Sequence, residues 1–224
     1  MSDGEQWPGE QSVEVANPPE EDTGEEPAAA ALEEPEEPAA APAEPGPEEP
    51  EPEQLAGHAP GGLDIPDGID LVEGSPWGTR KRVAIVLSRF NGDITNRLLA
   101  SALEELERAG IDHEHVTVMP VPGAFELPLG AMALAKTRRY VAIVALGCVI
   151  RGETPHFDYV AGEAASGLQL AALETGVPVA FGVLTTENLE QAMARADKGA
   201  EAVRSALEMA DLFSRLRATA KANA

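Results

Sequence analysis

The chain has 224 residues, and its formal net charge of −23 at pH 7 is distributed very unevenly. Of its 39 acidic residues, 22 precede Arg80, whereas none of its 16 basic residues does, so the remainder carries 17 acidic against 16 basic residues. Such an acidic segment repels nucleic-acid phosphates, which argues against a nucleic-acid partner. No stretch approaches the roughly 20 apolar residues of a membrane span, so we expect no membrane partner.

The N-terminal segment is rich in Glu, Pro and Ala, and it has almost no large apolar side chain between Met1 and Ala56. Its glutamates repel one another, and its prolines neither continue a helix nor pair in a sheet. Little apolar burial therefore offsets an ordering cost of roughly 1–2 kcal/mol per residue. We expect a disordered acidic extension over residues 1–67, a folded domain over 68–217 and a C-terminal tail over 218–224.

Targeting and redox features indicate a cytoplasmic protein. A secretory signal needs a basic start and an apolar run, and organelle transit peptides are rich in Arg and poor in acid, whereas this N-terminus has neither pattern. The single cysteine, Cys148, cannot form an intrachain disulfide and lies in an apolar run. We interpret it as a small buried side chain.

From residue 83 onward, short apolar runs alternate with segments of helical periodicity. Continuous apolar runs are typical of strands buried on both faces, and they occupy residues 83–87, 116–121, 140–146 and 179–184. Apolar residues at helical spacing predict helices at about 98–109, 125–136, 154–174, 189–196 and 199–216.

Four strand-then-helix units with short connections predict a three-layer α/β/α sandwich around a four-stranded, mostly parallel sheet, a flavodoxin-like arrangement. Residues 69–72 form a further candidate strand without an obvious partner in the chain. In open parallel sheets ligands bind outside the carboxyl ends of the strands, so the loops after the strands are the candidate sites.

The loops after the first two strands carry aromatic, amide and carboxylate groups. Phe90 can stack on a flat ring while Asn91 binds its edge, although a core plug followed by a turn residue would give the same pattern. Gly123 permits a close backbone approach. Glu126, in a first helical turn, can accept hydroxyl hydrogens from a polyol or simply stabilise the helix dipole.

The loop after the third strand has the features of an anion site. Thr154 as N-cap and Pro155 as first helical residue predict a helix start, and Gly152 lets backbone N–H groups face outward. Such a helix terminus suits a phosphate.

His156 falls in the first turn of that helix, where the positive end of the dipole disfavours an imidazolium ion. A general base requires the free imidazole. The other three histidines, His58, His113 and His115, lie in the extension or in a helix-to-strand loop, so His156 is the candidate catalytic residue.

Beyond the fourth strand, Phe181, Arg195 and Lys198 are either part of a phosphate or carbonyl site or ordinary surface residues. The chain has no Gly-x-Gly-x-x-Gly fingerprint, no Walker-type loop and no Cys/His cluster with metal spacing. We therefore expect neither a cofactor nor a metal.

Four segments together resemble the successive signatures of the lumazine synthase family: SRFN at 88–91, VPGAFE at 121–126, VIRGETPHFDY at 149–159 and FGVLT at 181–185. Their order, spacing and placement on strands agree across roughly residues 69–216. The resemblance implies condensation of 5-amino-6-(ribitylamino)uracil with 3,4-dihydroxy-2-butanone 4-phosphate to 6,7-dimethyl-8-ribityllumazine, without a cofactor. It also implies a homopentamer, or an icosahedral 60-mer cage of pentamers.

The resemblance further implies roles for individual residues. The pyrimidine and ribityl groups would be bound by Phe90, Asn91, Gly123, Ala124, Phe125, Glu126, Val149, Ile150, Phe181 and Lys198. The phosphate would be held by Gly152, Glu153, Thr154 and Arg195, and the protons would be transferred by His156. In this family the pocket spans two subunits, so that Phe181, Arg195 and Lys198 would come from a neighbour, whose sheet would also pair with the strand at 69–72.

One departure from the family motivates an alternative function. Arg195 and Lys198 are only three residues apart, whereas family members usually place a longer Gly- and Lys-containing segment between them. The alternative is a self-assembling shell or scaffold whose pocket binds a ligand with little or no turnover. The acidic extension is not a usual family feature either, and its sequence names no partner.

Overall fold

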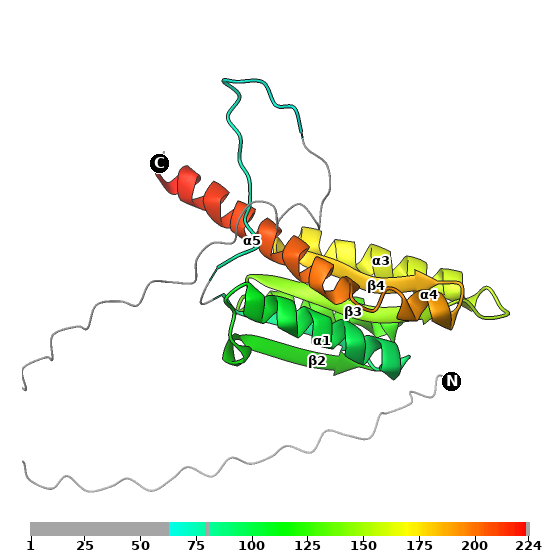
Figure 1. The fold of residues 1–224 in the computed structure, drawn as a ribbon. Helices are drawn as coiled ribbons and strands as arrows, with labels where there is room; N and C mark the ends of the chain where they lie inside the picture. Colours follow the sequence, from blue (N-terminus) through cyan, green and yellow to red (C-terminus); the bar gives the residue numbers. More distant parts are fainter. Residues whose placement is uncertain (1–62, 79–80, 223–224) are drawn as a thin grey trace, which may run out of the picture. The chain divides into compact units, whose positions relative to one another are not determined.

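The computed structural model describes residues 63–78 and 81–222, with side chains up to residue 220 (Figure 1). The predicted disorder of residues 1–67 therefore falls almost wholly outside the described residues. Among the helices within these ranges, none is both long and apolar enough to cross a bilayer.

One all-parallel sheet forms the centre of the folded unit. Its strands lie in the order β2-β1-β3-β4, with bounds Val83–Ser88 (β1), Val116–Val121 (β2), Ala142–Ile150 (β3) and Val179–Thr186 (β4). In the central strand, Val83 pairs with Val116 on one side and with Ala142 on the other. The predicted four-stranded sheet is thus confirmed, and every pair in it is parallel.

Helices cover both faces of the sheet, which confirms the three layers. One face is covered by α1 (Gly92–Arg108), α4 (Leu189–Met193) and α5 (Lys198–Ala222), and α1 and α5 lie side by side on it (Figure 1). The other face is covered by α2 (Leu127–Lys136) and α3 (His156–Thr175). Two short 3-10 helices, η2 (His113–His115) and η3 (Ala124–Glu126), precede β2 and α2 respectively.

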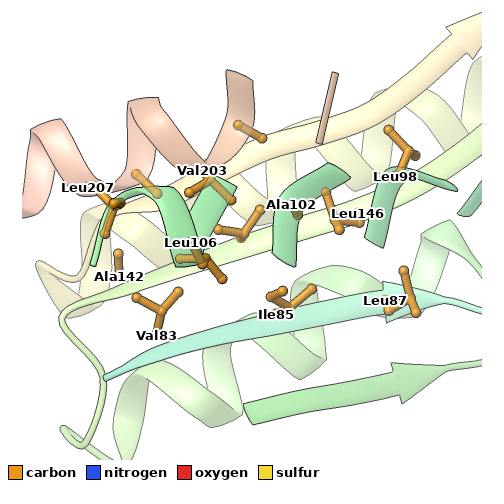
Figure 2. Packing of buried hydrophobic residues seen from close by; sticks show 14 of the residues in the cluster. Val83, Ile85, Leu87, Leu98, Ala102, Leu106, Ala142, Leu146, Val203 and Leu207 are labelled. Atoms are coloured by element: carbon orange, nitrogen blue, oxygen red, sulfur yellow. The ribbon is translucent and has the colours of Figure 1, made fainter. Parts of the chain in front are cut away.

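The alternation of side chains along β1 explains why both faces are buried. Val83, Ile85 and Leu87 point toward α1 and α5 (Figure 2), whereas Ala84 and Val86 belong to the core beneath α2 and α3. Successive strand residues face opposite sides, so a strand between two helical layers must be apolar at every position. The continuous apolar run of β1 is therefore a consequence of its central position.

Several element ends differ from the predicted ones. Strand β3 continues to Ile150, because it pairs with β4 along its whole carboxyl end. Helix α3 begins at His156 rather than at Thr154: Pro155 has ψ of −1°, and the Asp158 N–H closes the first turn on its carbonyl at 3.0 Å. Helix α5 continues to Ala222, beyond the expected end near residue 216.

The described residues 63–78 contain no strand, and residues 63–72 are exposed. The strand predicted at 69–72 had no partner within the chain, and its pairing with a neighbouring subunit stays a prediction. The following residues are anchored, since the Ser75 N–H donates to Asp211 at 3.0 Å and the Gly78 N–H to the Ala109 carbonyl at 3.2 Å. Trp77 also packs against the core between α1 and α5.

The anchor at Asp211 should make stability depend on pH. Burial raises the pKa of this carboxyl, but the hydrogen bonds from Arg215 and the Ser75 N–H, together with the charges of Lys81 and Arg215, hold the net pKa below its ordinary value. A carboxyl group whose pKa is lower in the folded than in the unfolded chain stabilises the fold at pH values above its unfolded pKa. This contribution is lost as the pH falls through the folded pKa.

An Asp211→Asn variant is therefore expected to be less stable than the parent chain at pH 7, and the difference should shrink as the pH falls through the lowered pKa of the parent carboxyl, which then becomes protonated itself. Urea midpoints measured from pH 7 to pH 2.5 test this. A difference that stays constant over the whole range would contradict it.

Candidate active site

A cavity of about 540 Å³ lies at the carboxyl ends of β1 and β3. From β1 the chain passes to β2 on one side, and then crosses to β3 and β4 on the other. The connections leaving β1 and β3 therefore diverge, which is where open α/β sheets bind ligands. The volume is in the usual range for sites that hold a small molecule.

The loop after β1 presents an aromatic ring to this cavity. Phe90 is 70% exposed, so the alternative interpretation of it as a core plug is wrong. The ladder between β1 and β2 continues through the Arg89 and Phe90 N–H groups, which donate to Val121 and Pro122 at 2.9 and 3.2 Å. These bonds hold the loop while its ring remains available for stacking.

Asn91 adopts a left-handed conformation, with φ of 58°, at the start of α1. Its side-chain amide donates to the Cys148 carbonyl in β3 at 2.9 Å. Asn91 is thus both the turn residue that the pattern predicted and a link between two walls of the cavity. Asparagine suits this position because it tolerates the left-handed region better than most residues do.

The loop after β2 contributes a carboxylate that is already oriented. The Gly123 N–H donates to Glu126 Oε2 at 2.8 Å, which holds the side chain at the start of the helical segment. A Cβ on residue 123 would lie 3.1 Å from the same oxygen, so glycine leaves space for this contact. An ionised carboxylate has about four acceptor sites, and it can accept further hydrogen bonds from a hydroxylated ligand.

The loop after β3 ends at the tip of α3. Gly152, Thr154 and His156 line the cavity, and a Cβ at residue 152 would meet open space. The first N–H groups of a helix lack intrahelical partners and carry a partial positive charge. The helix tip and an exposed imidazole therefore face the same cavity.

Cys148 also lines the cavity, but as a buried group. Burial raises the pKa of its thiol to about 11, so it stays protonated near neutral pH. A protonated thiol is a poor nucleophile, which agrees with the interpretation of Cys148 as a small buried side chain.

Comparisons with known proteins agree with these features. A model of the 6,7-dimethyl-8-ribityllumazine synthase family matches residues 80–214. The 6,7-dimethyl-8-ribityllumazine synthases of Yersinia pestis (strain Pestoides F) and Yersinia pseudotuberculosis serotype O:1b (strain IP 31758) are both 50% identical to the chain over 155 residues. These matches span 66% of the chain and 99% of each relative.

The chain belongs to the lumazine synthase family. By this membership it is an enzyme, a transferase of riboflavin biosynthesis. The matched region includes the sheet, its covering helices up to residue 214 and all residues that line the cavity.

The structure brings together most of the residues that the lumazine synthase resemblance singled out. The following eleven line the one cavity: Phe90, Asn91, Gly123, Ala124, Phe125, Glu126, Val149, Ile150, Gly152, Thr154 and His156. Glu153, between two of them, lines neither this cavity nor the second one.

The remaining three residues lie elsewhere in the chain. Phe181, which is 47% exposed, and Lys198 line a second, smaller cavity of about 260 Å³ along β4 and the start of α5. Arg195 follows α4, and its guanidinium donates to the Gln191 carbonyl at 3.0 Å. Lys198 is paired with Glu201. Within one subunit, these three side chains are therefore separate from the cavity that holds His156.

Three cavity residues on α3 were not singled out from the sequence: Phe157, Tyr159 and Val160. For Tyr159 and Val160 the signal that could have found them is their spacing from His156, because residues three and four apart lie on the same helix face. Phe157 directly follows His156, so this spacing does not indicate it.

Proposed function

We propose that the cavity at the carboxyl end of the sheet binds 5-amino-6-(ribitylamino)uracil and 3,4-dihydroxy-2-butanone 4-phosphate and condenses them to 6,7-dimethyl-8-ribityllumazine, with release of phosphate and two waters. The observation that carries the proposal is the convergence of Phe90, Glu126 and His156, from three different loops, on one cavity. We also propose that the enzyme works in the cytoplasm.

The pyrimidine substrate stacks on the exposed ring of Phe90, with its edge bonded by backbone groups of Val149 and Ile150. Both are half-buried at the end of β3, next to the cavity. The ribityl hydroxyls donate to the Glu126 carboxylate, whose orientation is held by Gly123. Stacking tolerates a flat heterocycle, and the carboxylate selects a polyol tail.

The phosphate of the ketone lies at the tip of α3, against the backbone of residues 152–154. Free N–H groups at a helix start suit a dianion. The substrate amine attacks the ketone carbonyl, and one water leaves to form an imine. Phosphate is then eliminated to leave an enol that becomes a second carbonyl, and the second nitrogen attacks this carbonyl and closes the ring with loss of a second water. His156 takes up and returns protons in these steps. Since both substrates are already reactive, orientation and proton transfer supply much of the acceleration.

A second subunit completes the site in this proposal. Phe181, Arg195 and Lys198 are separate from the cavity of their own chain, so they act in the cavity of a neighbour. Exposed apolar side chains on α2 and α3, among them Leu129 and Leu173 at 75% each, support burial between subunits. We propose a homopentamer, either free or assembled into an icosahedral cage.

The direct test of function is an assay of the purified full-length chain with both substrates, following product fluorescence. The expected result is a rate well above that of the spontaneous reaction. A rate equal to the spontaneous one, in a chain that still assembles, would leave the shell or scaffold as the function.

Intersubunit complementation tests the shared site. Phe90→Ala removes the stacking ring, worth about 1–3 kcal/mol, and Arg195→Ala removes the phosphate ligand proposed to come from the neighbour. Each variant alone is expected to be less active than the parent, by about 5- to 150-fold for Phe90→Ala, the factor to which 1–3 kcal/mol corresponds. Random mixed pentamers should regain up to about a quarter of the parental sites, because such a site needs an intact contribution from each chain.

The two variants are mixed by refolding them together, and product formation is compared with that of each variant refolded alone. Activity equal to the mean of the separate variants would contradict a site shared between subunits.

A further inference from the structure

Arg151 lies between two residues that line the cavity, Ile150 and Gly152, but does not line it itself. It follows β3 directly, and its N–H donates to the Thr186 carbonyl at 2.9 Å, so its backbone is held by the end of β4. Its side chain extends toward the first turn of α3. The resemblance to lumazine synthases assigned no role to this residue.

The guanidinium makes three kinds of contact at once. Its two Nη atoms donate to the two oxygens of Asp158 at 3.2 and 3.0 Å, a bidentate arrangement. Its Nε donates to Glu187 at 3.1 Å, and its Cζ lies over the Phe157 ring, 4.1 Å from the ring centre. Bidentate geometry and stacking specify an orientation, which a single ion pair does not.

These contacts connect three segments near His156: the end of β3, the first turn of α3 and the connection between β4 and α4. Arg151 and Asp158 flank the loop 152–155 and His156, so their ion pair closes that turn from both ends. Glu187 adds the connection between β4 and α4. Phe157, the neighbour of His156, lines the cavity and lies against the guanidinium. The position of the imidazole therefore depends on where Arg151 holds the first turn of α3.

The burial and charge of the network limit what else it can do. The carboxylates of Asp158 and Glu187 are 59% and 60% exposed, and exposed ion pairs add little to global stability. The two carboxylates also outweigh the charge of the single guanidinium and occupy three of its five N–H donors, so Arg151 is poorly suited to bind the phosphate itself.

We propose that Arg151 is a positioning residue: through Asp158, Glu187 and Phe157 it holds the first turn of α3 so that His156 stays in its reactive position. This inference rests on the proposed function of the cavity and adds a residue that contacts neither substrate.

The test begins with Arg151→Met, which keeps much of the side-chain length but removes the charge and the hydrogen bonds. We expect kcat to fall about tenfold, within the range that a misplacement of about 1 Å can cause. The KM for the pyrimidine and the urea midpoint should stay unchanged. Arg151→Lys should restore only part of the loss, because an ammonium group lacks the planar fork. Arg215→Met, which breaks an ion pair with Asp211 on α5, is the matched control and should leave kcat unchanged.

A double variant separates positioning from other roles. If Arg151 acts through His156, adding Arg151→Met to His156→Ala should lower kcat no further than His156→Ala does alone. A further tenfold loss in that background would overturn the proposal. A raised KM for the phosphorylated ketone at unchanged kcat, or a lowered urea midpoint, would do the same. If His156→Ala itself had the parental kcat, that result would contradict the proposed proton transfer by His156, whatever the effect of Arg151→Met.

Discussion

Changing His156 to alanine is expected to lower kcat by up to about 10²-fold while the chain remains folded. The imidazole is the first residue of α3, lines the cavity and is exposed, so its loss removes little packing. General acid–base groups contribute about 10²–10⁴-fold. We expect the lower end of that range, because the remaining site still orients two reactive substrates.

The measurement is steady-state formation of the fluorescent product under saturating concentrations of both substrates. His113→Ala is the matched control, since this second exposed imidazole lies on η2, outside the cavity, and pairs only with Glu107 at 2.8 Å among the contacts described. Its kcat should equal that of the parent. A kcat for His156→Ala within a factor of two of the parent would rule out the proton-transfer role.

Changing Gly199 to alanine is expected to destabilise the fold by about 3 kcal/mol, the upper end of the usual range for overpacking. A Cβ on this residue, in the first turn of α5, would lie 2.0 Å from the Leu98 carbonyl oxygen in α1. Two hydrogen bonds hold α1 against the start of α5. Ser101 Oγ donates to the Asp197 carbonyl at 2.7 Å and accepts from the Ala200 N–H at 2.9 Å. Separating the helices would open the core between α1 and α5.

Gly162→Ala is the matched control for this prediction. Residue 162 lies inside α3, and a Cβ there would meet open space, so alanine should add up to about 1 kcal/mol through its better helix propensity. Urea unfolding of the parent and both variants measures the two effects. Equal stabilities of the two variants would show that the contact between α1 and α5 does not depend on a glycine at residue 199.

The elements of this fold could be predicted because their signals are local. Each strand between two helical layers reads as an unbroken apolar run, and each helix as a stripe of apolar residues at helical spacing. The ends were less accurate. The continuation of β3 to Ile150 depends on pairing with β4, and the start of α3 at His156 depends on the ψ angle of Pro155; neither is visible in a local pattern.

The candidate site was predictable to the extent that it follows from topology. Phe90, Glu126 and His156 follow three successive strands, and parallel strands bring their carboxyl ends to one edge of a sheet. The helical residues Phe157 and Tyr159 were missed, since their apolar side chains are equally typical of a core. Nothing near Arg151 in sequence indicated its contact with Glu187, which is 36 residues away.

The sequence by itself determined the elements, their alternation, the parallel sheet and the strand ends that carry polar and aromatic groups, because burial and periodicity act over a few residues. Only the tertiary structure decided the strand order, the convergence of three loops on one cavity and the separation of Phe181 and Lys198 from it. The reason is that these depend on contacts between residues far apart in the chain, whose partners no local pattern specifies.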